Sequence, residues 1–323
     1  MDVAAFCAES RVLIVAGKGG VGKTTMVAAV ARMAADAGLS VLVVELEGKA
    51  GLAAALGGTE ELGYEEAVLY DAPGHGVVRG RRLTPDDALL EYLVDHGLQR
   101  VSKRLVSSGV LDVVATAIPG IRDVLVLGKV KQLERDRVAD LVLVDAPATG
   151  HAMTFLTSAG GLLDATRGGP VRAQAEEVVE LLTDPARCRV VLVTLPEEMP
   201  VSETVEAGYQ LEDKAGVRLG PVIVNGWDQV PAALSVDAAQ AAAAAGVRLD
   251  DGQLAALEAA RQFRVHRHRL AEDQVDRLSR ELPLPQLRAP ALLQPAIGPD
   301  EVRVLAAALA EGIGRMDTAR EAP

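Results

Sequence analysis

The glycines and lysines of residues 17–24, Gly-Lys-Gly-Gly-Val-Gly-Lys-Thr, are the part of this chain best suited to chemistry. They fit the pattern G-x-x-x-x-G-K-[ST], in which closely spaced glycines let backbone N–H groups point into one concavity. Lys23 then reaches the β- and γ-phosphates of a nucleotide, and the Thr24 hydroxyl ligates Mg²⁺. The expected nucleotide contacts of this loop are Gly17, Gly19, Gly20, Val21, Gly22, Lys23, Thr24 and Thr25.

The segments on either side of this loop are those that a phosphate-binding loop requires. Val12 to Val15 is a β-branched run typical of a buried parallel strand, and Thr25 to Ala35 is rich in Ala, Val and Met, as a helix would be. The N-terminus of that helix adds partial positive charge, which favours a phosphate. The alternative is a glycine-rich turn that matches the pattern by chance.

Lys18 makes the loop more specific. Residues 18–24 resemble the deviant Walker A motif of dimeric P-loop ATPases. This family includes arsenical pump-driving ATPases, tail-anchored protein targeting ATPases, septum-site and partition ATPases, and nitrogenase iron protein. The resemblance implies that Lys18 crosses a dimer interface to the nucleotide of the partner. The alternative interpretation of Lys18 is a solvated loop lysine.

A second cluster follows the apolar run from Asp140 to Asp145. A carboxylate that ends a buried strand beside a phosphate loop contacts Mg²⁺ through water, and Asp145 takes this role. The stretch 145–151 resembles switch II of the pump-driving and targeting ATPases. This implies that Asp145, Pro147, Gly150 and His151 relay the state of the γ-phosphate, with Gly150 supplying a flexible backbone. A loop histidine that is merely solvated is the alternative for His151.

Two further site residues rest on the same resemblance. The run 40–46 reads as a strand, and Glu47 after it aligns with the family's switch I aspartate, which positions the attacking water. Glutamate is one methylene longer, so the hydrolysis rate stays open, and a loop or capping carboxylate is the alternative. Residues 221–224 read as a strand ending in Asn225, which the resemblance assigns to the adenine edge. Its alternative is a strand-end turn residue.

The whole pattern predicts an α/β fold with a doubly wound, mostly parallel sheet of the P-loop type. We expect a single domain over 1–323, with helical insert segments at roughly 84–135 and 152–182 and a disordered tail at 314–323.

A hairpin is expected over 64–83, and the charged helix near residue 266 is expected to be solvated. Pro119-Gly120 with Asp123 resembles a segment of the pump-driving and targeting branch. In targeting relatives the helices after switch II line an apolar client groove. Met153, Phe155 and Leu156 are the candidates for such a groove here, but core packing is favoured.

Composition narrows the possible functions. The chain has 323 residues and a formal net charge of −12, which argues against sequence-independent binding of nucleic acid. Only Cys7 and Cys188 are present, so we expect neither a zinc nor an arsenite site, and free thiols suit a reducing cytoplasm. No stretch approaches the roughly 20 apolar residues of a membrane span. No signal peptide is apparent at the N-terminus.

Taken together, the motifs resemble the bacterial, especially actinobacterial, anion-transporting ATPase-like branch. The resemblance implies a cytoplasmic, ATP- and Mg²⁺-dependent ATPase that acts as a homodimer or as a heterodimer with a related subunit, coupling nucleotide state to a partner or client. Two alternatives stay open. One is a non-hydrolysing regulatory subunit, motivated by Glu47, and the other is a chaperone-like targeting factor for apolar membrane proteins.

Overall fold

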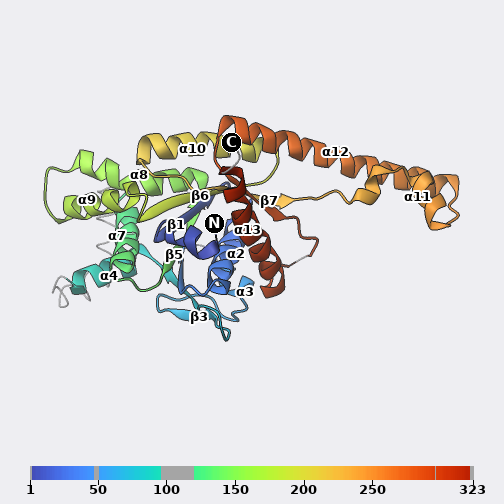
Figure 1. Ribbon diagram of the computed structural model, residues 1–323. Coiled ribbons are helices and arrows are strands. Elements are labelled where there is room, and N and C mark those ends of the chain that lie inside the picture. Colours follow the sequence, from blue (N-terminus) through green and yellow to red (C-terminus); the bar gives the residue numbers. More distant parts are fainter. Residues whose placement is uncertain (1, 47–50, 96–119, 295, 321–323) are drawn as a thin grey trace.

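The computed structural model describes residues 2–46, 51–95, 120–294 and 296–320, and within them eight strands form one sheet (Figure 1). Their spatial order is β3-β4-β2-β5-β1-β6-β7-β8. The strands are β1 Val12–Gly17, β2 Val41–Leu46, β3 Ala67–Tyr70, β4 Val78–Leu83, β5 Leu141–Ala148, β6 Cys188–Thr194, β7 Val222–Trp227 and β8 Gln286–Pro290. All neighbours pair in parallel except β3 and β4, which form an antiparallel hairpin.

The sequence explains this arrangement. β1 and β2 are buried along their whole length, as expected for parallel strands that helices cover on both faces. The chain leaves β1 for β2 on one side and later returns to β6 on the other side, with β5 inserted between β1 and β2. Ligands of open α/β sheets bind where the strand order reverses in this way. The fold is the doubly wound α/β fold that the sequence predicted.

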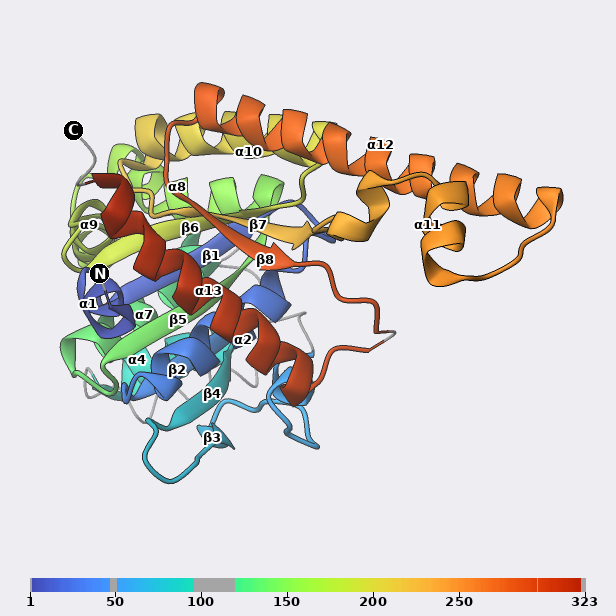
Figure 2. The same ribbon diagram turned by 45° about the vertical axis from the view of Figure 1, so that its right-hand side comes forward.

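Helices cover both faces of the sheet (Figure 2). One face packs against helices from both ends of the chain, α1 Val3–Ala8, α2 Lys23–Asp36, α3 Leu52–Ala55 and α13 Pro299–Arg320. The other face packs against α7 Ile121–Arg135, α8 Thr149–Ala165, α9 Pro170–Thr183, α10 Glu198–Gln210, the π-helical η1 Leu211–Ala215 and α12 Asp251–Glu281, while α4 Pro85–Asp95 adjoins α7. Two further elements, the 3₁₀ turn η2 Ala232–Ser235 and helix α11 Ala238–Ala245, precede α12.

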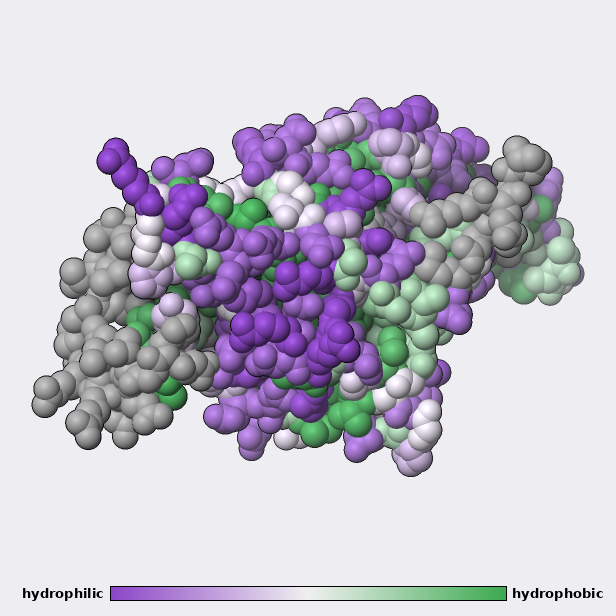
Figure 3. Space-filling model, turned by 60° about the vertical axis from the view of Figure 1, so that its left-hand side comes forward, coloured by the Kyte–Doolittle hydropathy of each residue, from purple (hydrophilic) through white to green (hydrophobic). Residues whose placement is uncertain are grey.

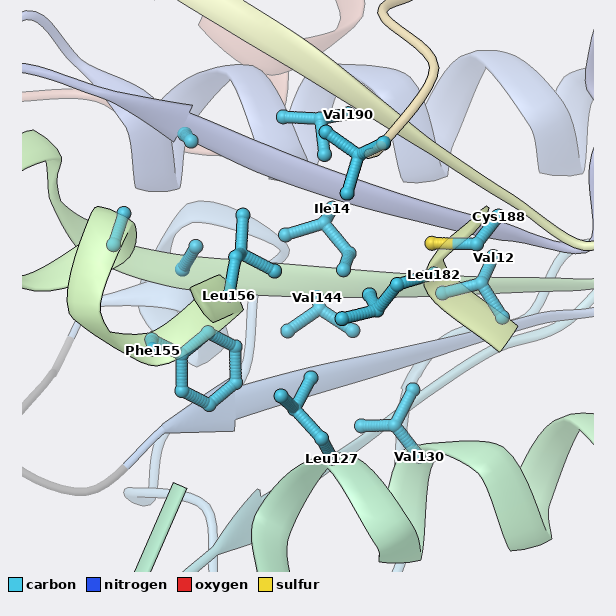
Figure 4. Close-up of a cluster of buried hydrophobic side chains, with 14 of the residues drawn as sticks. Val12, Ile14, Leu127, Val130, Val144, Phe155, Leu156, Leu182, Cys188 and Val190 are labelled. Atoms are coloured by element: carbon cyan, nitrogen blue, oxygen red, sulfur yellow. The ribbon is translucent and has the colours of Figure 1, made fainter. Parts of the chain in front are cut away.

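The core on the second face explains the apolar residues after switch II. Phe155 and Leu156 of α8 are buried among strand residues such as Ile14 and Val144, and Met153 packs against the same cluster (Figure 4). Core packing, favoured over a client groove, is therefore confirmed for these residues. On the side shown in Figure 3, hydrophilic residues cover most of the described surface, and apolar residues appear in smaller separate areas.

Helices occupy both ends of the segment 84–135, in which the sequence predicted a helical insert. α4 begins at Pro85, after the N-cap Thr84 accepts a hydrogen bond from the backbone of Asp87, and α7 ends at Arg135. Residues 96–119 of the expected segment 84–135 lie outside the described residues. α8 and α9 occupy the second expected segment.

Two boundaries differ from the sequence prediction. β7 continues through Asn225 to Trp227. α13 runs to Arg320, so the structure has helix over much of the predicted tail at 314–323. The physical reason is packing, because Ile313 is completely buried between α13 and the sheet.

α11 and the first half of α12 project beyond the sheet (Figures 1 and 2). Among the described residues of α12 only Val275 and Leu278 are buried, near its C-terminal end. Within the described part of the chain, no helix has both the length and the apolar character needed to cross a membrane.

Candidate nucleotide site

The loop between β1 and α2 contains two glycines at which a side chain would clash with a neighbouring strand. Gly17 has φ +153°, and a Cβ there would lie 2.3 Å from the carbonyl oxygen of Val193 on β6. Gly22, the N-cap of α2, has φ +86°, and a Cβ there would meet the amide nitrogen of Asn225 at 2.4 Å. The loop therefore folds tightly against the carboxyl ends of two neighbouring strands, where a backbone cradle for phosphate is expected.

Lys23 and Thr24 begin α2 at the open side of this loop. The Lys23 side chain is largely buried, and its Nζ donates a hydrogen bond to the Lys18 carbonyl oxygen at 2.8 Å, which closes the loop across its mouth. Thr24 Oγ1 donates to Asp145 Oδ2 at 2.7 Å. Thr25, in the same first turn of α2, is half-buried. The structure thus brings together the loop and the strand that the sequence assigned to phosphate and metal.

Asp145 comes from the centre of the sheet. It is completely buried in β5, in register with Val15 of β1. A hydroxyl and a carboxylate at hydrogen-bond distance are oxygen ligands of the kind that Mg²⁺ prefers. Thr24 and Asp145 are therefore the residues that would hold a Mg²⁺ ion, which would neutralise charge on the nucleotide phosphates.

Asn225 lies beside the phosphate loop. Its Nδ2 donates a hydrogen bond to the Val21 carbonyl oxygen at 2.8 Å. The side chain is half-buried within β7, so it is not the strand-end residue that the sequence predicted. This contact fixes the loop against β7 and leaves the Asn225 amide oxygen as a possible acceptor for a ligand.

Lys18 forms an ion pair within its own chain. Its Nζ lies 2.5 Å from Glu203 Oε1 on α10, and both side chains are about one third exposed. The two residues are 185 positions apart in the sequence. The sequence does not identify this partner, because α10 carries two other carboxylates, Glu198 and Glu206.

The switch II residues continue from Asp145. Pro147 and Ala148 complete β5, and Gly150 and His151 lie exposed in the first turn of α8. Burial raises the pKa of Asp123 on α7 above its usual value, and the nearby His151 opposes this shift by favouring the ionised carboxylate. His151 at the start of α8 therefore lies near enough to Asp123 to favour its ionised form, and Asp123 belongs to α7, in the segment where the sequence predicted a helical insert.

Glu47 lies outside the described residues, together with 48–50. The structure instead places Glu45 of β2 in register with Asp145 of β5 on one side and with Arg82 of β4 on the other. Arg82 donates to Glu45 Oε2 through Nη2 at 3.0 Å and through Nε at 3.2 Å. The Glu45 carboxyl is almost fully buried, and this burial raises its pKa despite the guanidinium.

Sequence reasoning missed this row of Asp145, Glu45 and Arg82. Its signal was present, since Glu45 is the one charged residue of an otherwise apolar strand. Glu45 Oε1 is buried and has no hydrogen-bond partner of ordinary geometry among the described residues, although the Leu52 backbone N–H lies close enough to help lower the pKa of this carboxyl. A buried acceptor that is poorly satisfied is costly, so a water molecule there would stabilise it.

Comparison with known proteins agrees with this geometry. The model of the CobQ/CobB/MinD/ParA nucleotide binding domain family matches residues 12–248, which include the loop, Asp145 and Asn225. The chain is 38% identical over 270 residues to ATPase BagA of Mycobacterium tuberculosis, covering 76% of this chain and 77% of that protein.

More distant relatives carry names from the pump-driving branch. A putative arsenical pump-driving ATPase of Halobacterium salinarum is 28% identical over 236 residues, and an arsenical pump-driving ATPase of Escherichia coli is 28% identical over 220 residues. These matches cover 67% of this chain but only 35% of each relative. The chain belongs to the CobQ/CobB/MinD/ParA nucleotide-binding domain family of P-loop proteins, and its relatives there include ATPases of the arsenical pump-driving type.

Proposed function

We propose that this protein is a Mg²⁺-dependent ATPase that works as a dimeric nucleotide switch. The observation that carries the proposal is the contact of 2.7 Å between Thr24 Oγ1 and Asp145 Oδ2, with Lys23 closing the adjacent loop. In this function the loop amides and Lys23 bind the phosphates, Thr24 and Asp145 hold Mg²⁺, and the Asn225 amide reads the adenine edge. The names of the relatives support ATP as the nucleotide.

Hydrolysis requires a group that positions water at the γ-phosphate. Glu47 is the proposed residue, and Glu45 lies two residues before it beside Asp145. Arg82 holds Glu45 in place, so Glu45 would position water beside a bound Mg²⁺ ion, and Glu47 would orient the attacking water.

The dimeric state is proposed from Lys18. The resemblance assigns this lysine to the nucleotide of a partner subunit, and in the single chain it is paired with Glu203 instead. An exposed ion pair of this kind contributes only about 0–1 kcal/mol, so a nucleotide phosphate in the partner can replace the carboxylate. Turnover of the protein alone would favour a second copy as the partner, and turnover only with an added related subunit would favour a heterodimer.

The proposal is tested by Mg²⁺-dependent ATP hydrolysis of the purified protein beside Lys23→Ala, Glu47→Gln and Glu45→Gln. We expect turnover to be lost in Lys23→Ala and Glu47→Gln and reduced in Glu45→Gln, with ATP binding retained in the two glutamine variants. If Lys23→Ala alone abolishes turnover, the role of Glu47 is wrong. ATP binding without turnover, restored by adding a related second subunit, would instead identify a regulatory member of a heterodimer.

A further inference from the structure

A groove of about 1110 Å³ runs along β8, the edge strand of the sheet, and continues past the amino ends of β7 and β6, where Arg218, Pro221 and Arg189 line it. We call it the β8 groove; its walls include Trp227, Asp228 and Arg264 on one side of β8 and Ala308, Glu311 and Gly312 of α13 on the other. Lining residues come from before β8, from the strand itself and from the segment after it, so the groove is as long as the strand. Figure 2 shows β8 between α12 and α13.

Among the described residues, none forms a hydrogen bond with the outer side of the β8 backbone. The Val222 N–H of β7 donates to the Pro285 carbonyl oxygen at 2.8 Å, and β8 is in parallel register with β7. Because backbone groups of a strand alternate in direction, Leu287 and Ala289 face β7, whereas the N–H and C=O groups of Gln286 and Arg288 face the groove. The groove therefore offers donors and acceptors at the spacing that an added strand would use.

The charge of the groove is opposite to that of the protein. Its lining includes five arginines, at positions 189, 218, 264, 288 and 315, against three carboxylates, at positions 9, 228 and 311, whereas the whole chain has a net charge of −12. Arg264 pairs with Asp228 and Arg189 with Glu9. Within the part of the chain that the structure describes, Arg218 and Arg288 pair with no carboxylate, and the Arg288 guanidinium lies 4.3 Å from the centre of the Trp227 ring.

We propose that the β8 groove binds an extended acidic peptide segment of a partner protein, which adds to the sheet as a further strand beside β8. Main-chain hydrogen bonds to Gln286 and Arg288 would hold the peptide. Its carboxylates would pair with Arg288 in the middle of β8 and with Arg218, which lies toward the other end of the groove, beyond the amino end of β7. The Trp227 ring holds the Arg288 guanidinium in a fixed orientation, which reduces the entropy lost on binding.

Two other roles of the β8 groove are protection of the sheet edge and pairing with a second copy of the chain. Arginines and flanking prolines at an edge strand also protect a protein against unwanted pairing, which would leave the groove without a ligand. A second copy of the chain pairing through β8 is disfavoured, because antiparallel pairing about a two-fold axis would bring the two Arg288 side chains together.

The test uses fluorescence polarisation of the full chain with a labelled peptide, Glu-Val-Glu-Val-Glu-Val-Glu. A peptide of equal charge, Glu-Pro-Glu-Pro-Glu-Pro-Glu, serves as the control, because proline removes backbone donors and disfavours an added strand. We expect the valine peptide to bind at least about tenfold tighter, and Arg288→Glu to weaken it at least about tenfold. Arg218→Glu provides an independent variant at the other end, and Arg303→Glu, on an exposed position of α13, is the matched control that leaves binding unchanged.

Several results would overturn the proposal. Equal binding of both peptides would show charge attraction without strand addition, and an equal effect of Arg303→Glu would show nonspecific attraction. Binding of neither peptide would indicate that the arginines only protect the edge. Self-association that Arg288→Glu abolishes, measured by sedimentation without peptide, would assign the groove to a second copy. Thermal melting of each variant confirms that loss of binding is not loss of the fold.

Discussion

Lys18 Nζ lies 2.5 Å from Glu203 Oε1, so the lysine for which we propose a role between subunits is held within one chain. If dimer formation requires Lys18 to leave Glu203, then Glu203→Gln should strengthen association in the presence of Mg²⁺ and a non-hydrolysable ATP analogue. The pair is partly exposed and is worth at most about 1 kcal/mol, so we expect a dimer dissociation constant about two- to fivefold lower. Sedimentation equilibrium measures this change.

Glu206→Gln is the matched control for that experiment. Glu206 lies on the same helix but is exposed and accepts a hydrogen bond from Gln210, so its neutralisation changes the charge equally without freeing Lys18. Weaker association of Glu203→Gln would mean that Glu203 itself contacts the partner. Identical behaviour of the two variants would mean that the ion pair does not restrain Lys18.

The contact between Thr24 and Asp145 predicts a graded response to substitution. Thr24→Ser keeps the hydroxyl and should keep hydrolysis within a few fold, whereas Thr24→Ala and Asp145→Asn should lower turnover by at least about tenfold and raise the Mg²⁺ concentration needed for half-maximal activity. Turnover measured against Mg²⁺ concentration checks this. A Thr24→Ala variant with an unchanged Mg²⁺ requirement would remove Thr24 from the metal site.

The phosphate loop and its flanking elements could be predicted because their signals are local. The β-branched run 12–15, the glycine spacing and the following helix agree with one another within about 25 residues, and Asp145 ends an equally clear apolar run. The resemblance to the family then predicted that the phosphate loop and the strand with Asp145 form one site. The structure confirms both strands and brings Thr24 into contact with Asp145.

What the sequence could not supply depends on contacts between distant segments. Glu203 reaches Lys18 across 185 positions, and Glu45 has a partner only because β4 lies next to β2 in the sheet. α13 continues past Gly312 because it packs on β8, where a Cβ at Gly312 would lie 3.0 Å from Leu287. Local composition indicated a fraying end there, and tertiary packing outweighs it.

The two thiols should be inert in the native protein. Burial raises the pKa of both Cys7 and Cys188 to about 12, so at pH 8 only about one thiol in ten thousand is ionised and neither is accessible to reagent. We expect no measurable reaction with a disulfide reagent within minutes until denaturant is added, when both react. Ala259→Cys, at an exposed position of α12, should react at once and so serves as the control. Fast labelling of the native protein would contradict the burial of these thiols.

The pair of Glu45 and Arg82 should give the protein a pH-dependent stability. Arg82→Ala leaves the buried Glu45 carboxylate unpaired, and we expect a loss of about 3 kcal/mol in the free energy of unfolding at pH 7. Burial already raises the pKa of Glu45, and loss of the guanidinium raises it further. A raised folded-state pKa means that stability falls as the pH rises through it, so the deficit of Arg82→Ala should shrink on acidification to pH 5.

Urea unfolding of the wild type and Arg82→Ala at both pH values measures this change, with Arg79→Ala as the control. Arg79 lies on the same strand and pairs with the more exposed Glu66. The double variant Glu45→Gln/Arg82→Ala should recover part of the lost stability and lose the pH dependence, because a neutral amide is cheaper to bury than an unpaired carboxylate. If Arg82→Ala loses the same free energy of unfolding at pH 5 as at pH 7, then Glu45 stays ionised in the variant. The burial of its carboxylate would then not explain why Arg82 stabilises the protein.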